Sequence, residues 1–351
     1  MRSFTSPYFD NLTFTAADLA TIQRLGEARG RQALFFRQVP EQLESLRQAA
    51  IIESSESSSR IEGIVAAPER IAALVKHSSE PRNRSEQEIA GYRDALALIH
   101  ESHAYMPFAV NVIKQLHTLL FRYVGADGGR WKPGDNDIVE RDSQGQVLRV
   151  RFRAVPAVQT AQAMDDLAAG YRRAVELEMR EPLVAAPLAV LDFLCIHPFR
   201  DGNGRVARLL TLLLLYHFDY QVGRYISLER IIEDSKETYY EALERSSQGW
   251  HQGDHPALPW LRYFWGVMIR AYGEFEERVG AMVAGRGSKG QQVRDAVHKR
   301  LGPFSLADIE AACPGVSRDM VRLVLRELRD AGEIELQGKG RGARWLKKLA
   351  M

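Results

Sequence analysis

The most informative stretch of the chain runs from His197 to Arg208 and reads HPFRDGNGRVAR. A periodic apolar helix is expected over 184–196, and Pro198 ends it because proline lacks the N–H that a helix interior needs. Two glycines then permit a tight turn, and a strongly apolar helix is expected over 205–218. The segment predicts two buried helices joined by a short polar loop.

The polar residues of this loop suit phosphate chemistry. Backbone N–H groups of 202–204 are expected to converge at a helix N-terminus, where the helix dipole also favours an anion. Arg205 and Arg208 are three residues apart, so one helical face is expected to present both to phosphate oxygens. Asp201 offers a hard oxygen ligand for Mg²⁺, and His197 is a candidate general base near neutral pH.

The same segment resembles the signature of the Fic family, HxFx(D/E)GNGRxxR, at every fixed position. Leu116 and His117, in an expected apolar helix, are also similar to that family's core, and the resemblance covers about residues 10–280. Fic enzymes mostly transfer AMP from ATP to a Ser, Thr or Tyr hydroxyl of a protein. The resemblance therefore implies a protein adenylyltransferase that uses Mg²⁺.

The resemblance also implies a role for each matching residue. His197 would deprotonate the target hydroxyl, Asp201 would hold Mg²⁺ on the α- and β-phosphates, and Phe199 would be a buried anchor. The ATP-binding residues would be Gly202, Asn203, Gly204, Arg205, Arg208, Tyr239 and Tyr240. Some relatives contact adenine through an Asn where this chain has Ser247, so the preferred nucleotide base stays open.

Residues 137–155 carry the one clear β signal. An extended run, polar turn residues at 142–145 and the alternating segment 147–153 predict a hairpin. Its position upstream of the loop resembles the Fic flap, which holds the target segment by strand addition. The resemblance implies that Val150, Arg151 and Phe152 dock the target.

Residues 53–63 are rich in serine, which is common in linkers. Within them, the stretch from Ser58 to Gly63 fits [S/T]xxxE[G/N], the inhibitory-helix motif of the same family. The resemblance implies that Glu62 binds Arg208, keeps it from the γ-phosphate and repels that phosphate. In some relatives this glutamate instead positions a water that removes AMP, so both reaction directions stay open.

Helical periodicity dominates the chain and predicts a mainly α fold, with a Fic-type helical core, the hairpin flap and a C-terminal winged helix-turn-helix-like domain. The expected helices cover 16–50, 87–103, 107–123, 159–178, 184–196, 205–218 and 256–280. The predicted domains are an N-terminal helical region with the inhibitory motif (1–105), the catalytic core (106–284) and the C-terminal module (285–351).

The C-terminal module follows an expected glycine-rich linker at 285–290 and is basic overall. Residues 291–348 resemble winged-helix domains, with helices at 291–301, 305–312 and from Ser317, and strands at 333–337 and 344–346. One helical face carries Arg318, Arg322, Arg326 and Arg329. That face predicts either contact with DNA phosphates or a solvated surface, and a homodimer is a further open alternative.

Composition limits the location of the protein. Cys195 and Cys313 are far apart and outside any CxxC pattern, so a disulfide framework or zinc site is not expected. The N-terminal residues lack the pattern of a signal peptide, and the longest apolar run, 209–215, is too short for a bilayer. We expect a cytoplasmic protein without a membrane partner.

Three functions compete. The favoured one is an adenylyltransferase that modifies an unidentified protein and, by analogy, itself. A Doc-type phosphotransferase would move the γ-phosphate, but such sequences depart from GNGR, which this chain keeps at Gly202–Arg205. An ATP-sensing, DNA-binding regulator would not need the base His197.

Overall fold

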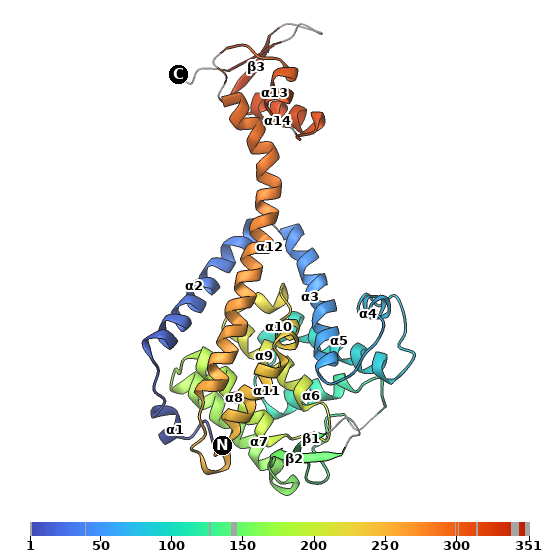
Figure 1. Cartoon of the computed structure of the whole chain (residues 1–351), viewed down its shortest axis with the longest axis vertical. Helices are drawn as coiled ribbons and strands as arrows, with labels where there is room; N and C mark the ends of the chain where they lie inside the picture. Colours follow the sequence, from blue (N-terminus) through green and yellow to red (C-terminus); the bar gives the residue numbers. More distant parts are fainter. Residues whose placement is uncertain are drawn as a thin grey trace. The chain divides into compact units, whose positions relative to one another are not determined.

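Two buried helices, α8 (Pro182–Ile196) and α9 (Asn203–His217), lie inside the first part of the computed structural model (Figure 1). Every side chain of α8 after Pro182 is buried, as expected for a helix that is apolar on all sides. Helix α8 packs against α9 and α7 (Ala157–Arg172). Helix α9 also packs against α5 (Arg84–Ser102) and α6 (Val110–Leu120). These contacts fix both ends of the HPFRDGNGR loop.

Helix α8 continues through Pro187 because another residue replaces the hydrogen bond that proline cannot make. The carbonyl of Leu183 would accept the N–H of residue 187 in an ordinary helix. It accepts the Trp265 indole N–H instead, at 2.8 Å, and the Pro187 carbonyl accepts the Trp260 indole N–H at 2.7 Å. Two tryptophans of the last helix of this unit therefore stabilise α8 next to the site.

The structure describes all residues except 1, 39, 126–127, 142–145, 299, 301, 314, 338–343 and 348–351. The chain divides into two compact units, Met1–Phe275 and Glu276–Met351. The first unit is mainly helical. Its other elements are α1 (Ser6–Asp10), α2 (Ala16–Gln38), α3 (Pro40–Ile61), α4 (Pro68–Val75), α10 (Leu228–Asp234), α11 (Lys236–Ser247), short 3-10 helices at His103–Tyr105, Val222–Arg224 and Trp250–Gln252, a π-helix at Arg173–Leu177, and strands β1 (Ile138–Arg141) and β2 (Val147–Phe152).

The predicted mainly helical fold is confirmed, with shifts at some helix ends. The helix expected over 16–50 is described as α2 and α3, and α3 continues to Ile61 through the serine-rich run. Ser54, Ser55 and Ser58 in this run are buried, so it is a packed helical face and not a linker. Helix α3 packs against α10 and α5.

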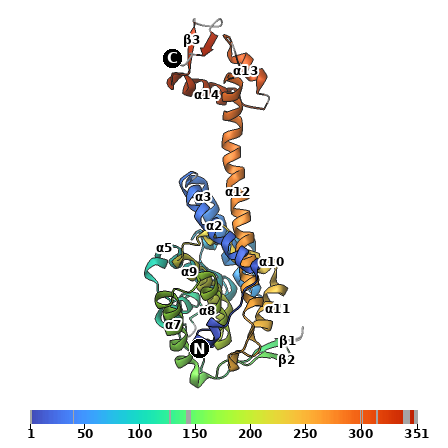
Figure 2. The ribbon, with the colours of Figure 1, turned by 90° about the vertical axis from the view of Figure 1, so that its left-hand side faces the viewer.

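Strands β1 and β2 form the predicted antiparallel hairpin, with Val139 opposite Val150. The hairpin lies at an edge of the first unit beside α11 (Figure 2). The predicted turn at 142–145 lies outside the described residues. In the described part of the chain this sheet has two strands, so each strand has an edge that a further strand could pair with.

The linker predicted at 285–290 is wrong, because helix α12 runs from Leu258 to His298 without a break. Glycine weakens a helix by about 1 kcal/mol, but it keeps the backbone N–H that proline lacks. The run 285–290 contains three glycines and no proline, so its pattern does not force a helix to end. The predicted domain limits at 105 and 284 stay predictions.

The second unit has its own hydrophobic core. The end of α12 packs there with α13 (Leu306–Ala312) and α14 (Arg318–Asp330), through buried residues that include Val293, Val297, Ile309, Val321, Val324, Leu325 and Leu328. Strands β3 (Ile334–Gln337) and β4 (Arg344–Lys347) pair antiparallel, and Phe304 forms a β-bridge with Trp345. Residues 338–343, between the two predicted strands, and Pro314 lie outside the described residues.

The first residues of the chain are held by a buried carboxylate of α8. Asp192 accepts hydrogen bonds from the backbone N–H and the hydroxyl of Ser3, and from the Trp250 indole N–H. Because water is excluded there, burial raises the pKa of Asp192 to about 6. Among the described residues, no helix combines the length and the hydropathy that crossing a bilayer requires.

Candidate active site

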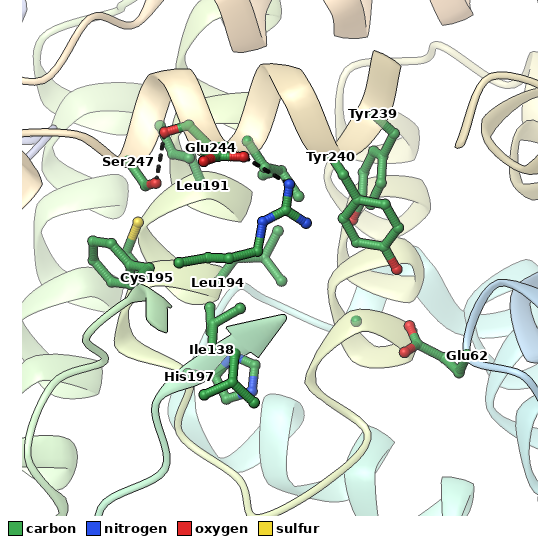
Figure 3. Close-up of a pocket in the computed structure, with 15 residues that line it drawn as sticks. Glu62, Ile138, Leu191, Leu194, Cys195, His197, Tyr239, Tyr240, Glu244 and Ser247 are labelled. Atoms are coloured by element: carbon green, nitrogen blue, oxygen red, sulfur yellow. Dashed lines mark hydrogen bonds and ion pairs between the residues drawn. The ribbon is translucent and has the colours of Figure 1, made fainter. Parts of the chain in front are cut away.

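A cavity of about 330 Å³ lies between the end of α8, the start of α9, α11 and the hairpin (Figure 3). Predicted site residues in its lining are Glu62, Arg151, Phe152, His197, Gly204, Tyr239, Tyr240 and Ser247. Glu62 lies at one end, below Tyr239 and Tyr240, and Cys195 and Ser247 lie at the other (Figure 3). Sequence positions far apart thus meet around one cavity.

His197 is the residue that turns the chain out of α8. Its backbone is left-handed, with φ 51° and ψ 59°, a conformation that ends a helix and is uncommon for a residue other than glycine. Burial, and next the charge of Lys132, lower the pKa of His197 to about 4, although Glu62 and Asp201 act in the opposite direction. The imidazole is therefore neutral at pH 7 and able to accept a proton.

Side chains from other elements bind the carbonyl groups of the loop. The Lys132 ammonium donates to the Ile196 carbonyl at 3.2 Å, and its backbone N–H donates to the Pro198 carbonyl at 2.9 Å. The Asn203 amide donates to the Phe199 carbonyl at 2.8 Å and accepts from the Phe199 N–H at 2.9 Å. The predicted phosphate-binding Asn203 thus has a structural contact through its side chain.

His117 fixes the next part of the loop. Its Nδ1 accepts the Gly129 N–H at 2.8 Å, so its Nε2 carries the proton and donates to the Asp201 carbonyl at 3.1 Å. Its ring also stacks on Phe199, with 3.7 Å between ring centroids, and Phe199 is fully buried as predicted. With these carbonyls bound, the N-terminus of α9 leaves its N–H groups for an anion.

Arg205 and Arg208 bind different partners, which differs from the predicted shared clamp. The Arg205 guanidinium is 1% exposed and pairs with the buried Glu88 of α5. It also lies 3.6 Å from an Asp201 oxygen. Arg205 therefore lies against α5, and Arg208, one turn later, lies against α3. A direct contact of Arg205 with phosphate stays a prediction.

Arg208 is buried and bonded to the inhibitory motif. Its guanidinium donates to the Ser58 hydroxyl at 2.9 Å, the Ser58 carbonyl at 2.8 Å and a Glu62 carboxylate oxygen at 2.9 Å. Burial by itself would lower the pKa of Arg208, but the Glu62 charge holds it above its ordinary value. The pair expected between Glu62 and Arg208 is thus present, while Ser58 binds Arg208 and not its own helix.

Two glycines determine where the Glu62 carboxylate lies. A Cβ at Gly204 would come 2.3 Å from a Glu62 oxygen, so glycine lets the carboxylate lie against the first turn of α9. Gly63 ends α3 with φ +80°, its N–H bonding the Arg60 carbonyl while the Ile64 N–H bonds the Ser59 carbonyl. This helix end directs Glu62 toward the N-terminus of α9, where an anion is favoured.

Aromatic and apolar side chains line the rest of the cavity. Tyr239 and Tyr240 pack edge to face, with centroids 5.2 Å apart, and Tyr239 also contacts Trp260. Leu191, Leu194, Cys195 and Leu243 line the cavity together with these tyrosines. The Ser247 hydroxyl donates to the Glu244 carbonyl at 3.0 Å. This part of the cavity can hold a flat, apolar group such as a nucleotide base.

The hairpin is tied to α11 by charge. Arg149 and Arg151 of β2 both bind the Glu244 carboxylate, at 2.8 and 2.6 Å. Phe152 stacks on His251 with 5.3 Å between ring centroids. Val150 is 46% exposed and lies outside the cavity lining. Arg151 and Phe152 thus face the cavity, while Val150 faces solvent on the hairpin.

Asp201 is placed to bind a metal beside the anion site. Its side chain is 60% exposed, and one carboxylate oxygen accepts the Gly202 N–H at 2.6 Å. Among the described residues, no group of three or more His, Cys, Asp or Glu side chains could hold a metal ion. One carboxylate fits Mg²⁺, which takes most of its ligands from phosphate oxygens and water.

Four important residues were missed from the sequence: Glu88, Lys132, Asn136 and Glu244. Asn136 donates to the Phe199 carbonyl at 2.8 Å, and the other three bind Arg205, the His197 loop and the hairpin arginines. Lys132 and Asn136 lie in an aperiodic run, GGRWKPGDND, that carries no helix or strand signal. Their roles become visible only when distant segments are placed together.

Residues 107–215, which contain the hairpin and the HPFRDGNGR loop, match the model of the Fic/DOC family. The match covers less than half of the chain and shows that this segment is similar to Fic domains. A curated relative, the ribonucleoside-diphosphate reductase small chain of Ostreid herpesvirus 1 (isolate France), is 28% identical over 166 residues. That match covers 44% of this chain and 28% of the length of the viral protein.

Solved structures with the same fold also carry Fic domains. A Fic family protein from Desulfovibrio desulfuricans G20 is 24% identical, with a TM-score of 0.60 and coverage of 96% of this chain and 97% of that chain. A Fic domain containing signaling protein from Bacteroides thetaiotaomicron VPI-5482 is 19% identical, with a TM-score of 0.61 and coverage of 74% and 97%. Fic-1 (residues 134–508) from C. elegans is 17% identical, with a TM-score of 0.57 and coverage of 77% and 74%. These likenesses establish the fold.

Proposed function

We propose that this chain is a protein adenylyltransferase that moves AMP from ATP to a Ser, Thr or Tyr hydroxyl of a target protein and is inhibited by its own Glu62. The observation that carries the proposal is the Glu62–Arg208 pair beside the N-terminus of α9, in which Glu62 lines the same cavity as His197. A carboxylate that is bound by an arginine beside a helix N-terminus marks a place where an anion can bind.

The transfer uses groups that line or adjoin the cavity. His197 accepts the proton of the target hydroxyl, whose oxygen forms a bond to the α-phosphorus. The bond from that phosphorus to the oxygen bridging the β-phosphate breaks, and pyrophosphate leaves. Mg²⁺ held by Asp201 would neutralise charge on the phosphates, and the N–H groups of Asn203 and Gly204 would bind their oxygens. The Gly202 N–H could join them only after it leaves the Asp201 carboxylate, which it bonds in this structure.

Inhibition follows from competition for one guanidinium. Arg208 has two hydrogen bonds to Ser58 of α3 and one to Glu62, so it is unavailable to the γ-phosphate while Glu62 is in place. The Glu62 carboxylate also lies against Gly204, where the charge of a triphosphate would be repelled. The inhibited enzyme is therefore expected to hold ATP in a pose unsuited to in-line attack. Hydrolytic removal of AMP, in which a water next to Glu62 attacks the phosphorus and the protein hydroxyl leaves, is the alternative reaction of the same site.

The nucleotide base and the target protein are expected to bind at separate surfaces of the enzyme. We propose that Tyr239, Tyr240 and the apolar wall near Cys195 hold adenine, since this wall accepts a flat ring. A target segment would pair with a free edge of the hairpin, near Val150, Arg151 and Phe152. The enzyme's own chain is one expected target.

The C-terminal unit keeps its predicted alternatives of DNA contact and dimerisation. Its order of helices, β-bridge and hairpin supports a winged-helix-like module. However, Arg318, Arg322 and Arg329 of α14 lie near acidic side chains, so the face is partly neutralised. We propose a cytoplasmic location because Cys195 and Cys313 are far apart in the sequence and outside any CxxC pattern, which fits a reducing compartment.

The test uses ATP labelled on either the α- or the γ-phosphate, with Mg²⁺. Glu62→Gly is expected to raise protein labelling from the α-label by about tenfold or more, equal to ~1.4 kcal/mol of barrier, because it frees Arg208. Adding His197→Ala should abolish it without loss of ATP binding. The matched control, Glu56→Gln, removes another α3 carboxylate that pairs with Arg60 and should change nothing. Transfer of the γ-label would instead indicate a phosphotransferase, and an unchanged rate in Glu62→Gly would refute inhibition.

A further inference from the structure

Lys132 is a buried lysine that has no part in the transfer steps proposed above. It is 4% exposed and lies in the segment between α6 and β1. Its ammonium donates to the Ile196 carbonyl at 3.2 Å and its backbone N–H donates to the Pro198 carbonyl at 2.9 Å. The side chain and the backbone N–H of Lys132 therefore bind the carbonyl groups of Ile196 and Pro198, the residues on either side of His197.

His197 needs such support because its backbone is held in an uncommon conformation. A left-handed residue with a side chain is strained and persists only when its surroundings fix it. Pro198 cannot donate a backbone hydrogen bond that would close the turn. Within the described segments, the two bonds from Lys132 restrain the carbonyls on both sides of this turn.

We propose that Lys132 is a positioning residue for the transfer reaction: it clamps the backbone on both sides of His197 and keeps the imidazole directed into the cavity. The inference rests on the proposed function, in which His197 is the base. Lys132 is absent from the described lining of the cavity, whereas His197 lines it. Lys132 therefore acts through His197 and not through contact with substrate.

The chemistry of Lys132 supports a role beyond filling space. Burial lowers the pKa of its ammonium to about 8, although Asp135 and Asp137 act in the opposite direction. A methionine of similar length would fill the same volume without the cost of burying a charge. A buried lysine is thus less favourable than methionine if the residue only fills space. What lysine adds is an N–H donor and a positive charge.

The ammonium charge also affects the proton affinity of His197. Burial is the first cause of the low pKa of the imidazole, and the Lys132 charge is the second. The charges of Glu62 and Asp201 and the backbone of Leu194 favour the protonated form of the ring and so raise its pKa. Removing the Lys132 charge should therefore raise the pKa of His197, and the loop should lose one of its two bonds.

The test compares Lys132→Met and Lys132→Arg, both in the Glu62→Gly background, with Lys76→Met as the control at an exposed lysine. Imidazole NMR titration gives the pKa of His197, whose signal is assigned by its loss in His197→Gln. We expect Lys132→Met to raise this pKa by about one unit and to lower kcat about tenfold, with KM for ATP nearly unchanged. Lys132→Arg should restore the pKa at least in part, and Lys76→Met should match the parent.

The titration separates this inference from the proposed function. An unchanged His197 pKa in folded Lys132→Met overturns the clamp, whether or not protein is labelled. A raised pKa with a lower kcat supports it. If the pKa of His197 rises in Lys132→Met but no variant transfers label, the role of Lys132 is supported and the proposed adenylyl transfer is rejected. A rise in KM with unchanged kcat would show that Lys132 serves ATP binding, and would also overturn the inference.

Discussion

At the scale of single residues, Arg208 shows why the inhibitory motif has more than one fixed position. A buried guanidinium requires acceptors for its N–H groups, because each unpaired donor costs free energy. Glu62 supplies one acceptor, while Ser58 supplies both its hydroxyl and its carbonyl. Ser58 is therefore part of the Arg208 site as much as Glu62 is.

This arrangement predicts that Ser58→Ala destabilises the protein and weakens inhibition. The loss of the hydroxyl leaves the Arg208 Nε without its acceptor, which should lower the free energy of unfolding by about 1–3 kcal/mol. Urea denaturation monitored by tryptophan fluorescence measures this change. The control is Ser59→Ala, since the Ser59 hydroxyl bonds only back to the Ser55 carbonyl of its own helix. Equal stability of the two variants would contradict the prediction.

At the scale of elements, α3 and α12 show where local composition misleads. Serine-rich and glycine-rich runs are typical of linkers, yet both segments are helical. In α3 the small side chains allow close packing, and Ser54 donates to the buried Glu229 of α10 at 2.7 Å. Partners that are distant in sequence thus decide the structure of the serine run, and composition does not contain them.

The Glu244 carboxylate of α11 is expected to limit the mobility of the hairpin. Glu244→Gln removes the charge that pairs with Arg149 and Arg151, and so weakens the attachment of β2 to α11. Backbone amides of 147–152 should then exchange hydrogen several-fold faster, which mass spectrometry can measure. Glu241→Gln on the same helix is the control, because the Glu241 carboxylate pairs with Arg245 of its own helix. Faster exchange in both variants would place the effect in α11 itself.

At the scale of the whole molecule, the sequence predicts the loop, the hairpin and the inhibitory motif because each is a local pattern. It predicts the Glu62–Arg208 pair only through a family resemblance, since the two residues are 146 positions apart. Lys132 and Glu88 have no such motif, and they lie 64 and 117 positions from their partners. Their roles depend on how α5 and the 130s segment pack on the loop.

Packing also buries several histidines, and this sets the pH dependence of stability. Burial lowers the pKa of His100 to about 3, and those of His117 and His255 to about 4. Their pKa values in the unfolded chain are near 6.5, so between about pH 4 and 6.5 the unfolded state binds more protons. The free energy of unfolding must fall as pH drops through this window. Asp192 acts oppositely, because its raised pKa lets the folded state bind a proton first.

We therefore predict a net loss of stability on acidification from pH 7 to 4.5, with each histidine contributing up to about 1.4 kcal/mol per pH unit and Asp192 offsetting about one of them. Urea denaturation at a series of pH values measures the slope. His117→Gln should flatten this slope, because the variant lacks the titrating imidazole. The variant should also be less stable at pH 7, because the Gly129 N–H loses its bond to the Nδ1 of His117. The exposed His77 serves as the control, and His77→Asn should leave the slope unchanged. A slope that His117→Gln does not alter would contradict the prediction, because it would mean that His117 binds protons equally in the folded and unfolded states.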